Sequence, residues 1–92
     1  KQFKEAEARS QEGIEIFPSQ PVLYLTHGVS LNYLNRPKEA IESLEMGLDY
    51  IIDDKPMEAD FHNQLAKAYT ATNNLTKAKT FIDKAKKLQL SN

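Results

Sequence analysis

Apolar residues recur along this chain at intervals of three and four positions and are separated by polar residues, a spacing that predicts amphipathic helices. Proline fits the first turn of a helix but cannot continue one, so Pro21, Pro37 and Pro56 are expected near helix starts. Short polar turns separate the apolar segments, and short turns join antiparallel neighbours. We therefore predict an all-α fold of five helices in antiparallel pairs, at about residues 2–17, 20–34, 37–51, 55–72 and 76–90.

The helical pattern also repeats itself along the chain. A shift of 34 positions carries Ala6 onto Ala40, and a shift of 38 positions carries Gly28 onto Ala66. Self-similarity at this period is typical of a stacked helical solenoid. Small residues that recur at fixed places in helices indicate where neighbouring helices approach most closely, at about 8 Å between their axes. We therefore expect Gly28 and Ala66 at the tightest crossings within their helix pairs.

The repeat offset grows by four residues after Gly47 and before Pro56. Four residues are about one helical turn. We therefore expect the third helix to be one turn longer than its counterparts, with Tyr50, Ile51 and Ile52 extending its apolar surface against the following helix. The alternative is that this extra turn protrudes as a docking ridge.

The repeated residues resemble the tetratricopeptide repeat, whose pattern places an aromatic residue, Leu, Gly and Tyr in one helix, Ala and Phe in the next, and then Pro. The matching residues in the last repeat are His62, Leu65, Ala66, Tyr69, Ala78 and Ile82, and those in the middle repeat are Tyr24, His27, Gly28, Leu31, Ala40 and Leu44. The resemblance implies a right-handed superhelical solenoid of antiparallel helix pairs with about two and a half repeats. These would be a half repeat at 1–18 and repeats at 19–55 and 56–92, in a single domain. Because the chain starts with Lys1 inside a repeat, we expect it to be the carboxy-terminal part of a longer protein.

Binding in this family is attributed to a concave groove lined by the first helix of each pair, and the resemblance implies the same use here. The residues at the groove positions are Val22, Leu25, Val29, Asn32, Tyr33, Asp60, Asn63, Lys67 and Thr70. We expect Leu25, Val29 and Asn63 to share one surface. Leu25 and Val29 stand where members that grip acidic chaperone tails need Lys and Asn, which argues against that ligand. A groove that is apolar at one end and polar at the other suits an amphipathic segment, unless further repeats cover the apolar end.

We therefore predict a non-enzymatic scaffold that binds a protein or peptide partner in this groove. The alternative is a purely structural carboxy-terminal cap of a longer solenoid, with no ligand of its own. No apolar run approaches the roughly 20 residues of a membrane span, so we expect no membrane insertion.

Charged residues are distributed unevenly, although the net charge is only −1. Acidic residues dominate the third helix and its following turn, at Glu39, Glu42, Glu45, Asp49, Asp53 and Asp54. Lysines dominate the fifth helix, at Lys77, Lys79, Lys84, Lys86 and Lys87, against Asp83 alone. Second helices of successive repeats lie side by side in this architecture, so we expect the opposite charges to face one another. Because the chain as a whole is slightly acidic, we expect no nucleic-acid partner.

The two histidines are the candidates for metal binding, pH sensing or catalysis. His62 lies near acidic residues, but it stands where the family places a large aromatic, and a metal site needs at least three convergent ligands. We interpret His62 as a helix-packing residue and His27 as a core histidine beside Gly28, with a pH sensor as the alternative for His27. No Ser, His and Asp have a spacing that places a nucleophile on a base. We therefore predict no catalytic residue, no metal and no cofactor.

The two ends of the predicted array differ. The first helix carries more apolar surface, at Phe3, Ile14, Ile16 and Phe17, than one neighbouring helix covers. The fifth helix has the largely polar outer side that a terminal cap requires. We therefore predict weak self-association through the amino-terminal helix.

Overall fold

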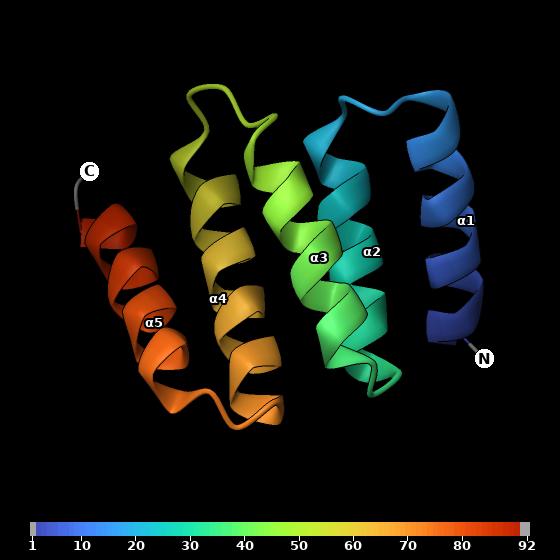
Figure 1. Ribbon diagram of the computed structural model, residues 1–92. Coiled ribbons are helices and arrows are strands. Elements are labelled where there is room, and N and C mark those ends of the chain that lie inside the picture. Colours follow the sequence, from blue (N-terminus) through green and yellow to red (C-terminus); the bar gives the residue numbers. More distant parts are fainter. Residues whose placement is uncertain (1, 91–92) are drawn as a thin grey trace.

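The computed structural model describes residues 2–90, which form five α-helices and no strand (Figure 1). The helices are α1 (Gln2–Ile16), α2 (Pro21–Tyr33), α3 (Pro37–Leu48), α4 (Lys55–Ala71) and α5 (Leu75–Leu90). Consecutive helices run antiparallel and each packs against the next, while α2 also contacts α4. The predicted all-α fold is thus confirmed for the described residues. Lys1, Ser91 and Asn92, which belong to the outermost expected repeats, lie outside them.

Local sequence signals account for the helix boundaries. Proline occupies the first or second position of α2, α3 and α4. The Asp54 side chain caps α4 by accepting a 3.1 Å hydrogen bond from the Met57 backbone N–H, which would otherwise lack a partner. The observed helix ends therefore agree with the predicted ones to within one or two residues, except at the carboxyl end of α3.

The turns after α2 and α4 have the same geometry. Asn35 and Asn73 each adopt the left-handed conformation, with φ of 63°. The next residue of each turn bonds the carbonyl five residues earlier, since Arg36 N–H donates to Leu31 (2.9 Å) and Asn74 N–H donates to Tyr69 (2.8 Å). Asparagine tolerates this conformation better than most residues and closes a helix end in this way.

The core lies between the helices and is tightest between α2 and α3. It is built from Tyr24, Leu31, Ala40, Leu44, Phe61, Leu65, Ala68, Tyr69 and Ala78. A Cβ atom added to Gly28 would overlap the Leu44 side chain, and one added to Gly47 would overlap Tyr24. Each glycine thus receives a large side chain from the partner helix, which confirms the close crossing expected at Gly28.

The expected extra turn of the third helix is wrong, because α3 ends at Leu48 and residues 49–54 connect it to α4. Backbone bonds from residue i to i−3 tighten the end of the helix, and Asp53 has a left-handed φ of 53° that a helix cannot contain. The Tyr50 ring stacks on Tyr24 at 5.7 Å between centroids. Ile52 is 88% exposed. The four added residues therefore lengthen a connection and leave an isoleucine in solvent.

The expected pairing between acidic α3 and basic α5 is also wrong. The two helices do not contact each other, and no ion pair joins them within the described residues, because α4 lies beside both. Tyr69 of α4 links them indirectly. Its hydroxyl donates to Glu45 Oε2 at 2.9 Å, and Lys77 Nζ lies 5.3 Å from its ring centroid. Burial and the hydrogen bond to Glu45 raise the pKa of Tyr69 to about 12.

Candidate interaction groove

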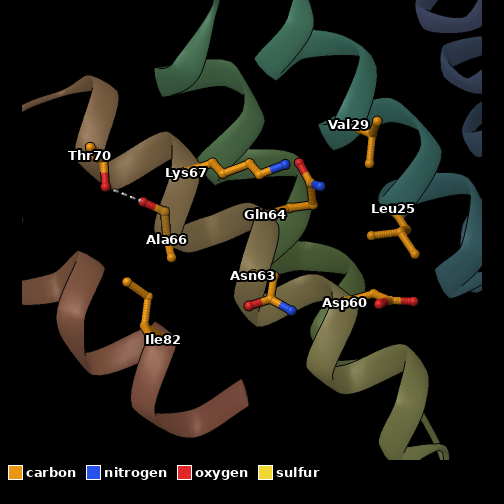
Figure 2. Close-up of a pocket in the computed structure, with 9 residues that line it drawn as sticks. All are labelled: Leu25, Val29, Asp60, Asn63, Gln64, Ala66, Lys67, Thr70 and Ile82. Carbon is orange, nitrogen blue, oxygen red and sulfur yellow. Dashed lines mark hydrogen bonds between the residues drawn. The ribbon is translucent and has the colours of Figure 1, made fainter. Parts of the chain in front are cut away.

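A hollow of about 730 Å³ lies between α2, α4 and α5 (Figure 2). Figure 2 shows α4 running through the middle, with Leu25 and Val29 of α2 on one side and Ile82 of α5 on the other. The remaining lining residues all come from α4, namely Asp60, Asn63, Gln64, Ala66, Lys67 and Thr70. We call this hollow the groove.

The helical period of α4 places its polar residues in the groove. Side chains three and four positions apart share one face of a helix, as Asp60, Asn63, Gln64, Lys67 and Thr70 do. The opposite face carries buried Phe61, Leu65 and Ala68 into the core. Because the apolar face of α4 packs against the neighbouring helices, its polar face is directed towards the groove.

Several polar groups in the groove have no partner within the chain. Among the described residues, the side chains of Asp60, Asn63 and Lys67 form neither a hydrogen bond nor an ion pair. Thr70 differs, because its hydroxyl donates to the carbonyl of Ala66 at 2.8 Å. The groove thus offers a carboxylate, an amide and an ammonium group to a ligand beside apolar walls.

One side chain joins the two helices that border the groove. The Asn32 amide of α2 donates to the Gln64 carbonyl oxygen of α4 at 3.1 Å and to Gln64 Oε1 at 2.9 Å. These bonds fix α2 against α4, which otherwise touch over a short stretch. Asn32 therefore sets the width of the groove at this end.

The structure brings most of the predicted groove residues together. Those that line the groove are Leu25, Val29, Asp60, Asn63, Lys67 and Thr70. Asn32 and Tyr33 line an adjoining hollow of about 240 Å³, which shares Gln64 and Lys67 with the groove. Val22 lines neither hollow and is exposed near the start of α2. Whether these residues bind a partner stays a prediction.

Gln64, Ala66 and Ile82 line the groove without having been assigned to it from the sequence. Gln64 could have been found, because it lies four positions after Asp60 and three before Lys67 on the same helix face. Ile82 matches a position of the repeat pattern, yet it is 40% exposed. It lies at the edge of the contact between α4 and α5, while Ala78 and Ala85 occupy its centre.

The fold brings a serine and a glutamate to the two sides of His27, a meeting that their sequence spacing does not indicate. His27 Nδ1 lies 2.9 Å from Ser43 Oγ, and Nε2 lies 3.1 Å from Glu7 Oε2. These residues come from α2, α3 and α1, and Arg36 approaches Glu7 at 3.8 Å. Ser43 is only 6% exposed and lines neither of the two hollows described above. The geometry is that of a buried network that ties three helices together.

His62 lies in the contact between α4 and α5, against the Phe81 ring at 5.5 Å between centroids. It is buried, and its Nδ1 atom has no hydrogen-bond partner among the described residues. Burial lowers the pKa of His62, with Glu58 acting in the opposite direction and Lys84 in the same one. Within residues 2–90, no three His, Asp or Glu side chains converge as metal ligands.

The comparison with protein families finds one similarity, which covers the last repeat. Residues 59–92, a little more than a third of the chain, match the family model of the tetratricopeptide repeat. This segment is similar to a tetratricopeptide repeat. The matched segment supplies most of α4 and all of α5, and with them every groove residue outside α2. No curated protein and no solved structure gives a significant match.

Tetratricopeptide repeats are non-catalytic and generally mediate protein–protein interactions. No helix of the described part of the chain is both long enough and apolar enough to cross a membrane.

Proposed function

We propose that this chain is a protein-interaction scaffold that holds a peptide or partner segment in the groove. The observation that carries the proposal is the convergence of side chains from α2, α4 and α5 on one hollow, with unpartnered Asp60, Asn63 and Lys67 beside apolar Leu25, Val29 and Ile82. This mixture suits an amphipathic segment, whose apolar side chains face α2 while its polar groups meet α4.

We further propose that the helices form a right-handed superhelical solenoid of two and a half repeats. The equal turns at Asn35 and Asn73, which lie 38 positions apart, support the division into an α2–α3 repeat and an α4–α5 repeat. In this arrangement α1 is the second helix of a preceding repeat and packs on α2 as α3 packs on α4. The repeat boundaries at 1–18, 19–55 and 56–92 belong to the same proposal.

The groove is tested with ligands selected from short random peptides displayed on phage, using the intact chain as bait. Leu25→Glu is expected to abolish binding of the selected peptides without loss of helicity, because it places a charge on the apolar wall. Leu75→Glu is the matched control, since Leu75 is exposed outside the groove. Equal affinity of both variants and the parent for every selected peptide would refute the groove as the binding site.

A structural role as a terminal cap is the second candidate function. It is favoured by the outer side of α5, where Lys79, Thr80, Lys86 and Lys87 are exposed and Lys79 pairs with Asp83 at 3.2 Å. A polar outer face is what a terminal repeat needs. Under this alternative the display selection yields no peptide that depends on Leu25.

Weak self-association through α1 completes the proposal. Among the described helices, α1 packs against α2 alone, and its apolar Phe3 and Ile14 are only half-buried. Apolar helix surface that lacks a second neighbouring helix marks an interaction site. Sedimentation over a concentration series is expected to show a mass that rises with concentration.

A further inference from the structure

Large apolar side chains are exposed mainly at one end of the helical array. This end carries the connection between α1 and α2 and the connection between α3 and α4 (Figure 1). The exposed residues are Ile16, Phe17, Val22, Tyr50 and Ile52, which we call the loop-end patch. Ile52 is 88%, Ile16 67% and Phe17 57% exposed. The opposite end carries the turns at Asn35 and Asn73 and exposes fewer such side chains, Tyr33 and Leu75.

The two connections of the loop-end patch are held by one buried side chain. The Tyr24 hydroxyl donates a 2.6 Å hydrogen bond to the carbonyl of Pro18 in the first connection. The ring of Tyr24 stacks on Tyr50 of the second connection, at 5.7 Å between centroids. Because both connections are anchored to α2, the patch is preformed and costs little ordering on binding.

The sequence around the patch is mainly acidic, and the nearest cation along the chain after Ile52 is the exposed Lys55. Neither residues 10–35 nor residues 39–54 contain a Lys or an Arg. The acids of these two segments are Glu12, Glu15, Glu39, Glu42, Glu45, Asp49, Asp53 and Asp54. Glu15, Asp49 and Asp53 are exposed and adjoin the apolar residues directly in sequence. The lysines of α5 lie on a helix that does not contact α3.

This combination of charge and apolar surface restricts what can cover the patch. Anionic lipid and nucleic acid are repelled by the acidic surroundings. A symmetric contact with a second copy would bring the same acids against one another. We propose that the loop-end patch is a second interaction surface, separate from the groove, which docks a basic and apolar segment of a protein partner. Its apolar side chains cover Phe17 and Ile52, and its Lys or Arg side chains meet Glu15, Asp49 and Asp53.

The proposal is tested by selecting short random peptides on phage against the intact chain and removing those that also bind a Phe17→Ser, Ile52→Ser double variant. Both positions are exposed, so the substitutions leave the core unchanged. The peptides that remain are expected to combine Lys or Arg with apolar residues. Fluorescence anisotropy of a selected peptide is expected to show about tenfold weaker binding to Ile52→Ser and unchanged binding to Leu75→Ser, an exposed control at the other end of the array.

Charge is tested separately by Asp53→Asn, which removes one acid and keeps a residue that tolerates the left-handed φ of 53°. Binding is expected to weaken about twofold to threefold and to depend less on salt.

Four results would overturn the proposal. The first is a selection that leaves no peptide, or leaves acidic ones. The second is equal loss of binding in Leu75→Ser and Ile52→Ser. The third is a ligand that Leu25→Glu releases while Ile52→Ser does not, which would assign it to the groove. The fourth is occupation of the patch by anionic vesicles or by a second copy, shown by vesicle flotation or by self-association that Ile52→Ser removes.

Discussion

In the α2–α3 pair the helices approach each other through Gly28 and Gly47, whereas in the α4–α5 pair the equivalent positions hold Ala66 and Ala85. The contacts between the helices differ accordingly. His27 and Ser43 are hydrogen-bonded at 2.9 Å in the first pair. At the equivalent place 38 positions later, the second pair has apolar Leu65 and Phe81.

Aromatic stacking takes the place of the close glycine contacts in the second pair. The Phe81 ring lies 5.7 Å from Tyr69 and 5.5 Å from His62, measured between centroids. The comparison shows that two antiparallel helices can pack either through glycines that receive large side chains or through aromatic rings placed between them. The two pairs should therefore respond differently to added volume, to lost hydrogen bonds and to pH.

The largest expected difference between the two helix pairs is in how much stability each loses when a larger side chain is introduced. Gly28→Leu is expected to lower the free energy of unfolding by about 3 kcal/mol, because its side chain would overlap Leu44. Ala66→Leu is expected to cost about 1 kcal/mol, because Ala66 borders the groove and the added methyl groups have space there. Urea denaturation measures both, with Ala71→Leu on the exposed end of α4 as the control. Equal losses would mean that both pairs close in the same way.

The buried hydroxyl of Ser43 provides the next test. Ser43→Ala removes the partner of His27 Nδ1, and a buried ring nitrogen without its partner is expected to destabilise the fold by about 2 kcal/mol. Ser10→Ala is the matched control, since Ser10 is also buried but bonds only to the Ala6 and Glu7 carbonyls of its own helix. If the two variants unfold at the same denaturant concentration, the network between α1, α2 and α3 contributes no stability.

A smaller effect is expected at Tyr69, which stands where the first pair has Leu31. Tyr69→Phe keeps the ring stacked on Phe81 but removes the hydroxyl that donates to Glu45 at 2.9 Å. We expect a loss of about 1 kcal/mol in the free energy of unfolding. Tyr33→Phe, at an exposed tyrosine stacked on Phe3, should be neutral. Equal stability of Tyr69→Phe and the parent would show that the bond to Glu45 contributes nothing to the fold.

The smallest expected effect is the pH dependence at His62. Burial lowers its pKa in the folded chain, whereas the unfolded chain has the ordinary value of about 6.5. The unfolded chain therefore takes up a proton as the pH falls through that value and the folded chain does not, so stability is complete above it and is lost below it.

His62→Phe should reduce this loss between about pH 7.5 and about pH 5.5, because a phenyl ring has no proton to gain. Thermal unfolding at both pH values, for the parent and the variant, measures the difference. An identical pH dependence in the two proteins would show that His62 is as easily protonated in the folded chain as in the unfolded one.

Local signals explain why most of the fold could be predicted. Pro21, Pro37 and Pro56 act on their own helix starts, and the apolar period of each helix is a property of that helix alone. The groove residues Asp60, Asn63 and Lys67 were assigned through the resemblance to the tetratricopeptide repeat, and the helical period places them on one face of α4. Gln64 lay on that face as well and was missed, although the period includes it.

Contacts between distant residues explain what could not be predicted. Residues 49–54 are compatible with another turn of α3, but the Tyr50 ring stacks on Tyr24, which lies 26 positions earlier in the chain. The acids of α3 and the lysines of α5 are complementary in sequence but are kept apart by α4. The sequence pattern of α5 places Ile82 on its apolar face. Ile82 lies at the edge of the contact with α4, however, and is therefore exposed to the groove.

The sequence by itself determined where the helices begin, which of their faces are apolar and where glycine allows two helices to touch, because each of these depends on residues within a few turns of one another. Only the tertiary structure decided that Glu7 and Ser43 meet on the two sides of His27, since they lie 20 and 16 positions from it and carry no signal of their pairing. The same holds for the loop-end patch. Tyr24 contacts both the α1–α2 and the α3–α4 connection, which lie at one end of the array. No local sequence pattern indicates that Phe17 and Ile52 share that end.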